Sequence, residues 1–176
     1  RDREYIIITL GSYLMGSIPF GFILTKLFLN KDIRNIGSGN IGATNVLRTG
    51  NKSIGYATLI LDISKAVLPV IFIKFNYQDY IYIASLSAFL GHVFPVWLKF
   101  KGGKGVATYV GILLSINLVY GLVFIISWII IFLFSRYSSL SSIIASLSVP
   151  IYLLFFENFN SIFYGIMFIL IFYTHK

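Results

Sequence analysis

The 176-residue sequence contains no cysteine, only two histidines and only 11% charged residues. The absence of cysteine excludes disulfides, thiolate metal sites and a cysteine acyl-enzyme. Two histidines provide little material for a zinc site built from side chains, so we expect neither a metal nor a cofactor. Charged residues make up about a quarter of a typical soluble domain. The low charge content therefore excludes an ordinary soluble domain.

Apolar residues make up 57% of the chain, and the mean hydropathy is +0.86. They recur in segments throughout the sequence rather than at the N-terminus alone, which excludes a soluble protein that carries a signal peptide. We expect an all-α, polytopic membrane protein in which residues 1–176 form a single integral-membrane domain. Because residue 1 is arginine rather than methionine, we expect the gene product to begin upstream.

Seven segments are predicted to cross the bilayer, from their apolar length at a rise of about 1.5 Å per residue. Their expected bounds are 5–29, 53–75, 80–98, 105–117, 118–134, 143–156 and 161–174. Pro19 and the glycines beside it are expected to bend the first segment. The connections at 76–79, 135–142 and 157–160 are expected to be turns. The boundary between the fourth and fifth segments stays open, since a single bent helix is the alternative.

Lysine and arginine are distributed unequally between the two ends of these segments. Arg1, Arg3 and Lys74 fall on one side, and Lys65 falls within a segment. The other side receives ten basic residues, namely Lys26, Lys31, Arg34, Arg48, Lys52, Lys99, Lys101, Lys104, Arg136 and Lys176. Positive residues accumulate on the cytoplasmic side of membrane proteins. We therefore expect a protein of the bacterial cytoplasmic (inner) membrane. The polar connections on this side and the C-terminus are expected to face the cytosol. The formal net charge of +8 reports this topology, and we expect no nucleic-acid partner.

A glycine-rich polar stretch at 37–48 follows the first apolar segment and reads Gly-Ser-Gly-Asn-Ile-Gly-Ala-Thr-Asn-Val-Leu-Arg. Glycine allows backbone N–H groups to surround an anion, and Arg48 adds a planar fork that suits phosphate oxygens. Ser38 is a candidate nucleophile, or a residue that orients one. The candidate phosphate-binding residues of this stretch are Gly37, Gly39, Asn40, Gly42, Thr44, Asn45 and Arg48.

A second polar stretch, at 91–108, joins a glycine turn to three lysines and contains His92. The residues that it offers as a second anion site are Gly102, Gly103, Lys104 and Gly105. Either stretch alone is also compatible with an ordinary cytoplasmic loop that follows the charge rule. A lone histidine such as His92 is more often a hydrogen-bonded structural residue, and we expect it to brace the loops.

Two further patterns do not indicate nucleotide sites. Residues 37–42 spell Gly-x-Gly-x-x-Gly with Asp62 twenty residues later, but a dinucleotide fingerprint needs a preceding strand, and here a membrane helix precedes. Residues 102–105 lack the spacing of a nucleoside-triphosphate loop. Asp62 instead lies three residues before Lys65, on the same helix face. We expect a structural ion pair directed at neighbouring helices.

Taken together, the two stretches closely resemble the motifs of the acyl-phosphate:glycerol-3-phosphate acyltransferase family (PlsY). That family is marked by Ser-Gly-Asn-x-Gly-x-Thr-Asn-x-x-Arg, present here at 38–48, and by Gly-His-x-Phe-Pro, present at 91–95. Its pattern Phe-x-Gly-Gly-Lys-Gly-Val-Ala-Thr is met at 100–108. The likeness extends to 16–21 and to 136–140, so it spans nearly the whole chain.

The resemblance implies an acyltransferase that moves a fatty acyl group from acyl phosphate to the 1-hydroxyl of glycerol 3-phosphate, without coenzyme A. The products would be 1-acylglycerol 3-phosphate (lysophosphatidic acid) and phosphate, in the first acylation of phospholipid synthesis. The enzyme would act as a monomer in the lipid bilayer. The acyl chain of the substrate would lie in a groove between apolar segments.

The resemblance also implies which residues bind substrate. Arg48, Lys104 and the glycine loops would bind phosphate and stabilise developing negative charge. Asn45 would help to orient the substrate. His92 and Arg136 would support the site.

Catalysis would fall to Ser38 and His175, beside the reacting carbonyl and hydroxyl. A third family motif contains a histidine followed three residues later by an asparagine; His175 matches the histidine, and the sequence ends at Lys176. His175 is our preferred general base, with the departing phosphate as the alternative. Ser38 is expected to donate a hydrogen bond rather than to form a covalent acyl intermediate, because no base lies beside it in the sequence.

Two other classes of function stay open at this level. In a small anion channel or transporter, the basic loops would recruit phosphate and the segments would form a pathway. Against this class, the obvious charges within the segments are the Asp62–Lys65 pair, with no ring of cations and no clear repeated halves. A structural lipid-binding subunit would show neither flux nor turnover.

Overall fold

The computed structural model describes residues 1–156 and 161–176, and every regular element in these two ranges is a helix. The α-helices are α1 (Asp2–Gly16), α2 (Phe20–Leu29), α3 (Ala43–Leu47), α4 (Lys52–Asn76), α5 (Ile81–Val93), α6 (Val106–Ile116), α7 (Leu118–Ser135), α8 (Ser138–Phe156) and α9 (Ser161–Thr174). Short 3₁₀ helices are η1 (Ile33–Asn35), η2 (Gln78–Tyr80) and η3 (Val96–Leu98). The prediction of an all-α chain is confirmed for the described residues.

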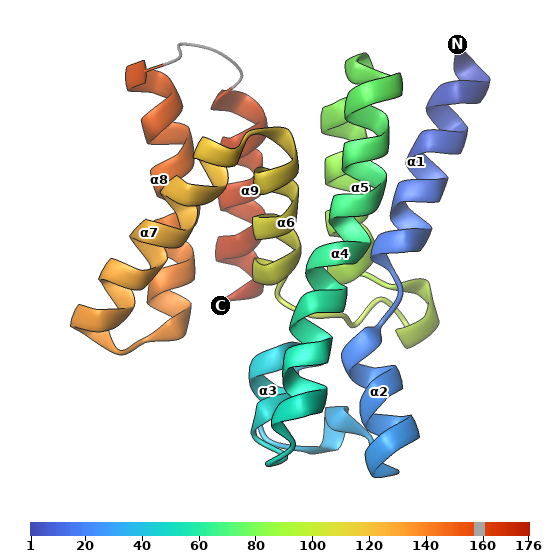
Figure 1. The fold of residues 1–176 in the computed structure, drawn as a ribbon, viewed down its shortest axis with the longest axis vertical. Coiled ribbons are helices and arrows are strands. Elements are labelled where there is room, and N and C mark those ends of the chain that lie inside the picture. Colours follow the sequence, from blue (N-terminus) through green and yellow to red (C-terminus); the bar gives the residue numbers. More distant parts are fainter. Residues whose placement is uncertain (157–160) are drawn as a thin grey trace.

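The helices form two groups that meet at α4 and α6 (Figure 1). In the first group, α1 packs along α5 and against α4, with α2 and α3 beside the first half of α4. In the second group, α7 packs against α6 and α8, and α8 packs against α9. The N-terminus lies at one end of the molecule, and the C-terminus lies about halfway along it (Figure 1). This arrangement places the end of α9 beside Lys104, which precedes α6.

Within residues 1–156 and 161–176, five helical segments are long and apolar enough to cross a bilayer, by length and composition. They are Asp2–Leu29, Lys52–Asn76, Gln78–Leu98, Leu118–Ser135 and Ser138–Phe156. Two further apolar helices, Val106–Ile116 and Ile162–Thr174, are shorter. Each of the seven predicted segments contains helix where the structure describes it, although the first is interrupted at 17–19 and the third at 94–95.

The first segment is broken rather than bent. Helix α1 ends at Gly16 and α2 begins at Phe20, because Pro19 has no N–H to continue the hydrogen-bond ladder. The carbonyl oxygen of Ile18, at the break, accepts a hydrogen bond from Lys65 of α4 at 2.9 Å. A lysine from a neighbouring helix thus satisfies a main-chain group that the break exposes.

The fourth and fifth segments are separate helices. Asn117 has an extended backbone, with φ −157° and ψ 126°, and its side chain accepts a hydrogen bond from the N–H of Val119 at the start of α7. The far end of α6 is held by Lys74 of α4, which donates to the carbonyl oxygens of Ser115 and Ile116 at 3.1 and 3.0 Å. The alternative of one bent helix is therefore excluded.

One predicted boundary was wrong by five residues. The sixth segment was expected to start at 143 after a turn at 135–142, whereas α8 starts at Ser138. The hydroxyls of Ser141 and Ser142 donate hydrogen bonds to the carbonyl oxygens of Tyr137 and Ser138, respectively, four residues earlier. Serine can be satisfied inside a helix in this way, so a polar composition did not signal a turn. The turn predicted at 157–160 lies outside the described residues.

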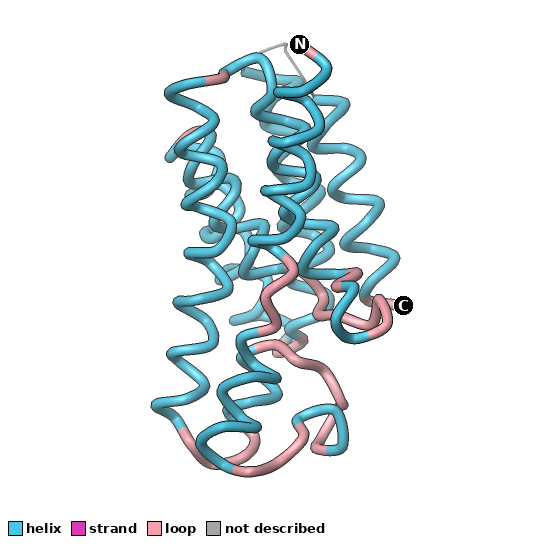
Figure 2. Tube along the Cα trace, turned by 90° about the vertical axis from the view of Figure 1, so that its right-hand side faces the viewer, coloured by secondary structure: helices cyan, strands magenta, loops and turns pink. Residues whose placement is uncertain are grey.

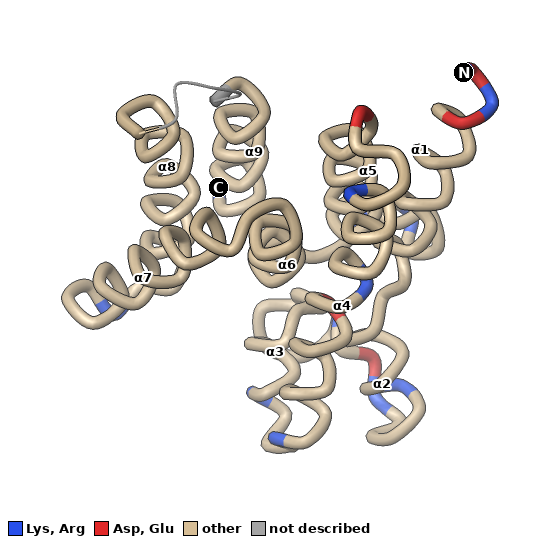
Figure 3. The backbone as a smooth tube through the Cα atoms, turned by 45° about the horizontal axis from the view of Figure 1, so that its top comes forward, with Lys and Arg blue, Asp and Glu red and all other residues tan. Residues whose placement is uncertain are grey.

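Most of the loop structure lies in the half of the molecule away from the N-terminus (Figure 2). Basic positions gather around α2 and α3 and at the end of α7, and residues of both signs lie at the N-terminus (Figure 3). The two glycine-rich stretches belong to the loop-bearing half. Their helices deliver them to a common place, described next.

Candidate active site

Asn45 organises the first glycine-rich loop. Its Nδ2 donates to the carbonyl oxygens of Ile36 and Asn40 at 2.9 and 2.8 Å, and its Oδ1 accepts from the N–H of Ser38 at 3.2 Å. Gly37 has φ +53°, and a Cβ at this position would collide with Asn45 Oδ1, so the turn requires glycine. The loop is thus built around a buried amide whose polar atoms are already used.

The second loop is tied to the end of α5. The N–H of Gly102 donates to Val93 O at 2.9 Å, and that of Gly103 donates to His92 O at 3.2 Å. These two N–H groups are therefore occupied within the protein. The start of α6 at Gly105 has no side-chain cap, so its first N–H groups stay available beside Lys104. Such a helix start favours negative charge.

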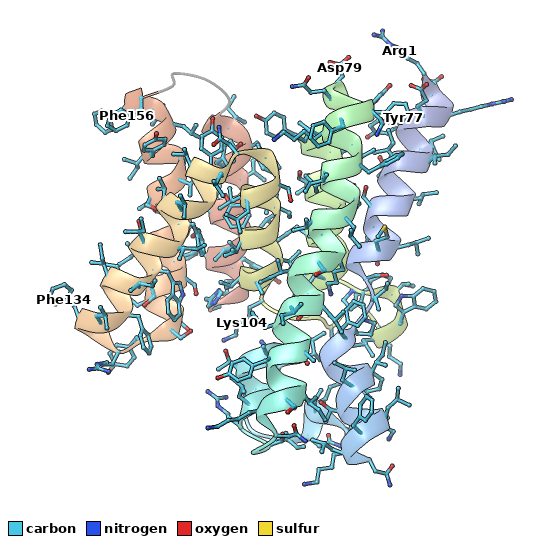
Figure 4. The ribbon with its side chains drawn as sticks, in the orientation of Figure 1. Arg1, Tyr77, Asp79, Lys104, Phe134 and Phe156 are labelled. Carbon is cyan, nitrogen blue, oxygen red and sulfur yellow. The ribbon has the colours of Figure 1, made fainter. Side chains whose placement is uncertain are left out.

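Both loops and the end of α9 line one cavity of about 540 Å³. Its polar wall comprises Ser38, Asn40, Gly42, Thr44, Asn45, Arg48, Asp62, His92, Lys104, Gly105 and His175. Lys104 lies near the C-terminal end of α9 (Figure 4), where its carbonyl oxygen accepts a hydrogen bond from Thr174 Oγ1 at 3.0 Å. Residues more than 120 positions apart in the sequence thus face the same space.

Most of the remaining lining is apolar. It comprises Ala43 of α3 and, from α4, α6 and α7, Leu59, Ile63, Val106, Ala107, Val110, Phe124, Ile125, Trp128 and Ile129. A cavity with both apolar and basic lining residues suits a ligand with an apolar chain and an anionic head.

Three serines of α8, Ser138, Ser139 and Ser142, also line the cavity and were not among the predicted site residues. Ser142 Oγ accepts a hydrogen bond from Trp128 Nε1 at 3.0 Å. The signal that could have indicated them is the 136–140 stretch, which contains Ser139 and belongs to the family pattern. Because this stretch was predicted to lie in a turn, its position at the start of α8, beside the cavity, was not expected.

Five predicted residues do not line the cavity. Four of them are glycines that belong to the two loops but lie outside the cavity lining, namely Gly37, Gly39, Gly102 and Gly103. Arg136 is exposed at the C-terminal end of α7, with a left-handed φ of 63°. The structure therefore brings together both basic loops and His175, and leaves Arg136 outside them.

His175 is half-buried at the cavity, one residue past α9. Its Nδ1 lies 2.8 Å from the carbonyl oxygen of Ile171. A carbonyl only accepts, so Nδ1 carries the proton and Nε2 keeps a free lone pair in the neutral ring. Burial lowers the pKa of His175 below its ordinary value; the hydrogen bond to Ile171 opposes this, and the charge of Lys104 adds to it. The ring is thus held as a neutral base.

The charges at the cavity are predominantly positive. Arg48 and Lys104 carry full positive charges, and the carboxylate of Asp62 is paired with Lys65 at 3.2 Å. The expected Asp62–Lys65 ion pair is therefore confirmed, although Asp62 also faces the cavity. No group of three or more potential metal ligands occurs in the ranges 1–156 and 161–176. The site attracts anions through side chains and helix ends.

Comparison with known proteins yields one consistent result. The family model described as "Glycerol-3-phosphate acyltransferase" matches residues 6–176. A glycerol-3-phosphate acyltransferase of Pelagibacter ubique is 77% identical over 173 residues, which is 98% of this chain and 91% of that protein. One from Bartonella henselae is 56% identical over 154 residues, covering 85% of this chain and 73% of that protein.

Two solved structures share the fold. The crystal structure of PlsY (YgiH), an integral membrane glycerol 3-phosphate acyltransferase, in its glycerol 3-phosphate form has a TM-score of 0.89 and 35% identity. The lysophosphatidic acid form of PlsY has a TM-score of 0.87 and 33% identity. Each match covers 98% of this chain and 88% of the other.

Proposed function

Because this chain belongs to the glycerol-3-phosphate acyltransferase family, we propose that its cavity transfers a fatty acyl group from acyl phosphate to the 1-hydroxyl of glycerol 3-phosphate. The protein is a multi-pass membrane acyltransferase that uses glycerol 3-phosphate. The observation that carries the proposed donor is a single cavity that is lined by basic residues, called here its basic end, and by apolar side chains of α4, α6 and α7. An acyl phosphate has the same two-part character, and it requires neither coenzyme A nor a cofactor.

The basic end would bind the two phosphate groups. Arg48 can hold two phosphate oxygens with its planar fork, and Lys104 contributes a point charge beside the uncapped start of α6. Bringing two anions together is the main obstacle to this reaction, because acyl phosphate is a reactive mixed anhydride with a good leaving group. The same cations would stabilise the negative charge that develops on the carbonyl oxygen and the leaving phosphate.

His175 would accept the proton. The 1-hydroxyl oxygen of glycerol 3-phosphate attacks the acyl carbon, the anhydride C–O bond breaks, and phosphate leaves with the bonding electrons. The hydroxyl proton passes to Nε2 of His175, the nitrogen that the Ile171 hydrogen bond leaves free. Phosphate as the proton acceptor is the alternative, and the pH dependence considered below distinguishes the two.

Ser38 would act as a hydrogen-bond donor to the acyl phosphate. Its Oγ accepts from the N–H of Asn40 at 3.4 Å, which leaves the hydroxyl hydrogen for a substrate oxygen. Among the described residues, no histidine, lysine or carboxylate forms a hydrogen bond with Ser38 Oγ, so the base that an attacking serine requires is missing. This supports direct transfer over an acyl-enzyme. Asn45 would act by shaping the loop that presents Ser38.

The proposal also covers the topology and the oligomeric state of the enzyme. We propose seven crossings, both glycine-rich loops and the C-terminus on the cytosolic side of a bacterial inner membrane, and a monomer in the bilayer. The concentration of basic positions in the loop-bearing half supports this orientation (Figure 3). A water-soluble acceptor would then reach the basic end from the cytosol. The relatives give no support to an anion channel or transporter.

The decisive test is incubation of the purified protein with acyl phosphate and glycerol 3-phosphate, with detection of lysophosphatidic acid and released phosphate. We expect turnover by the wild type. Arg48→Ala should lose at least about a hundredfold in kcat/KM, since an electrostatic donor at the reacting group contributes on that order, while the variant still inserts into membranes. Turnover with acyl-coenzyme A but not with acyl phosphate would refute the proposed donor, and full activity of Arg48→Ala would remove Arg48 from the site.

A further inference from the structure

The ion pair of Asp62 and Lys65 is almost completely buried against the wall of the cavity. The two side chains are 4% and 2% exposed, and Asp62 Oδ1 lies 3.2 Å from Lys65 Nζ. Asp62 lines the cavity, whereas Lys65 lies behind that lining. Charges this deep in a membrane protein are costly, and they commonly serve a function beyond the contact itself.

Lys65 connects three separate elements. Besides Asp62 on its own helix α4, its Nζ donates to Ile18 O, at the break between α1 and α2, at 2.9 Å, and it lies 2.8 Å from Nδ1 of His92 on α5. The ring of Phe20, the first residue of α2, lies 5.9 Å from the same nitrogen. Lys65 Nζ thus has two hydrogen-bond partners and an ion-pair contact with Asp62, whose Oδ1 has no hydrogen-bond partner among the described residues. Contacts from three elements therefore hold Lys65 in place.

The contact with Lys65 fixes the state of His92. An ammonium has no lone pair, so Nδ1 of His92 must accept and the ring proton lies on Nε2. His92 is itself buried, at 4% exposure. The lysine thus sets both the tautomer and the orientation of a ring that faces the cavity.

His92 in turn supports the loop that carries Lys104. Its carbonyl oxygen accepts from the N–H of Gly103 at 3.2 Å. Its ring lies directly against Gly103, where a Cβ would collide with Nε2. The next residue is Lys104, whose carbonyl oxygen is held from the other side by Thr174. The position of Lys104 therefore depends on His92 on one side and on α9 on the other.

We propose that Lys65 is a positioning residue for acyl transfer: it locks His92 as the Nε2–H tautomer and thereby holds the Gly103–Lys104 segment at the phosphate groups. Asp62 serves to keep Lys65 charged and in place. This inference rests on the proposed function, because it assumes that Lys104 acts on a phosphate of the substrates. A purely structural ion pair would affect folding without affecting the turnover of folded protein.

Removing both charges together separates these two roles. A single substitution leaves an unpaired buried charge and destabilises strongly, whereas loss of the whole pair is often neutral for stability. We expect the double variant Asp62→Asn/Lys65→Met to fold, with a Tm lowered about as much as by loss of another lysine that donates to main-chain carbonyls, and with kcat at least about tenfold lower, because small displacements of catalytic groups reduce rates by such factors. In ¹⁵N NMR of labelled His92, the wild type should show the Nε2–H tautomer alone and the double variant a mixture.

Two further variants complete the test. Lys74→Met removes the other lysine of α4 that donates to main-chain carbonyls, far from the cavity, and should lower Tm without changing kcat or KM. His92→Leu keeps the ion pair and should reduce kcat about as much as the double variant; it also serves if the double variant does not fold.

Several outcomes would overturn the proposal. One is wild-type kcat in a stable double variant, and another is wild-type kcat in His92→Leu. A double variant that is slow while His92 keeps its single tautomer would assign the loss to Asp62 itself, and would equally refute the positioning role. A wild-type protein that transfers no acyl group would instead refute the proposed function, and the parallel wild-type assay identifies that case.

Discussion

At the level of single residues, Asn45 supports the first loop through hydrogen bonds to several main-chain groups. It is 1% exposed, and its amide bonds several main-chain groups of 33–40. Asn45→Ala leaves buried carbonyl groups without partners, each worth about 1–3 kcal/mol. We expect the loop to lose its shape, with at least a tenfold loss of turnover and a lower Tm.

Asn51 offers a matched control, because it lies just beyond the same loop and also uses its amide for the main chain. Its Oδ1 accepts from the N–H of Ile54 at the start of α4. Asn51→Ala should reduce stability by about 1 kcal/mol, as for other helix caps, and should keep normal turnover in thermal-melt and activity assays. Equal kinetic losses in both variants would mean that general loop stability, rather than the shape around Ser38, limits the reaction.

The pH dependence of turnover tests the role of His175. Its pKa is lowered from the ordinary value, so the neutral, proton-accepting form persists to lower pH than in a free histidine, whose pKa is about 6.5. The acid limb of the kcat/KM profile should therefore lie below pH 6.5, with activity falling as pH drops through the lowered pKa. Lys104→Gln removes a nearby positive charge and should move this limb to higher pH. If His175→Ala keeps the wild-type limb, the departing phosphate is the proton acceptor.

The sequence identified the residue types of the site but not how each is used. Arg48, Lys104 and His175 were predicted from motifs, and all three line the cavity. Two features could not be predicted. The amide of Asn45 is already hydrogen-bonded to main-chain groups, and the N–H of Gly103 is hydrogen-bonded to the carbonyl oxygen of His92. Hydrogen bonds between residues distant in sequence depend on how helices pack, and a motif does not encode their packing.

At the level of elements, α7 forms much of the apolar wall of the cavity. Phe124 is 1% exposed and packs edge-on against Tyr109 of α6, with ring centroids 5.6 Å apart. One turn beyond, Gly121 packs directly on Leu114 of α6 and closes the space between the two helices. Among the α7 residues that line the cavity, Phe124 is nearest in sequence to this contact, and we expect it to lie at the end of the cavity. Its size should limit the length of the acyl chain.

Phe124→Ala should shift the preference towards longer acyl phosphates. A methylene in an apolar pocket contributes about 1–3 kcal/mol to discrimination, so the ratio of kcat/KM for an eighteen-carbon over a fourteen-carbon donor should rise by roughly tenfold. Ile126→Ala is the control, since Ile126 lies on the same helix, is 55% exposed and does not line the cavity. An unchanged ratio in Phe124→Ala would place the end of the acyl chain elsewhere.

Element boundaries could be predicted where glycine, proline or asparagine marks them. Pro19 indicated a bend, which the structure shows to be a break, and Asn117 marked one of the two alternatives for the fourth and fifth segments. The start of α8 was missed because its serines bond their own helix, so a polar composition was mistaken for a turn. The division at Asn117 also needed the structure to decide, since a bent helix would have had the same hydropathy.

At the level of the whole molecule, the absence of cysteine provides a direct test of topology. Single cysteines can be introduced into a chain that has none. Lys101→Cys and Arg136→Cys, both at exposed positions of the loop-bearing half, should react with a membrane-impermeant maleimide only when the cytosolic face is accessible. Asp79→Cys, which is also exposed, should react only from the opposite face. Labelling of all three from one face would exclude the proposed orientation.

The packing of the whole chain was the least predictable from sequence. Charge counting and hydropathy indicated helices with basic residues at one end, which agrees with the observed distribution (Figure 3). Neither could indicate that 37–48, 91–108 and His175 meet at one cavity, because α4, α5, α6 and α9 must pack correctly to bring them together. The motifs predicted that these residues act together, and the fold shows that they line one cavity.

Helices α6 and α9 have 11 and 14 residues, about 17 and 21 Å at the usual rise, against a hydrocarbon thickness of about 30 Å. The cavity lies beside the start of α6 and the end of α9, so we expect the shortness of these two helices to let water reach the cavity from the cytosolic side. A substrate could then react while its long tail stays in the bilayer. Each methylene lifted into water would oppose the reaction by about 0.8 kcal/mol, a penalty that this arrangement would avoid.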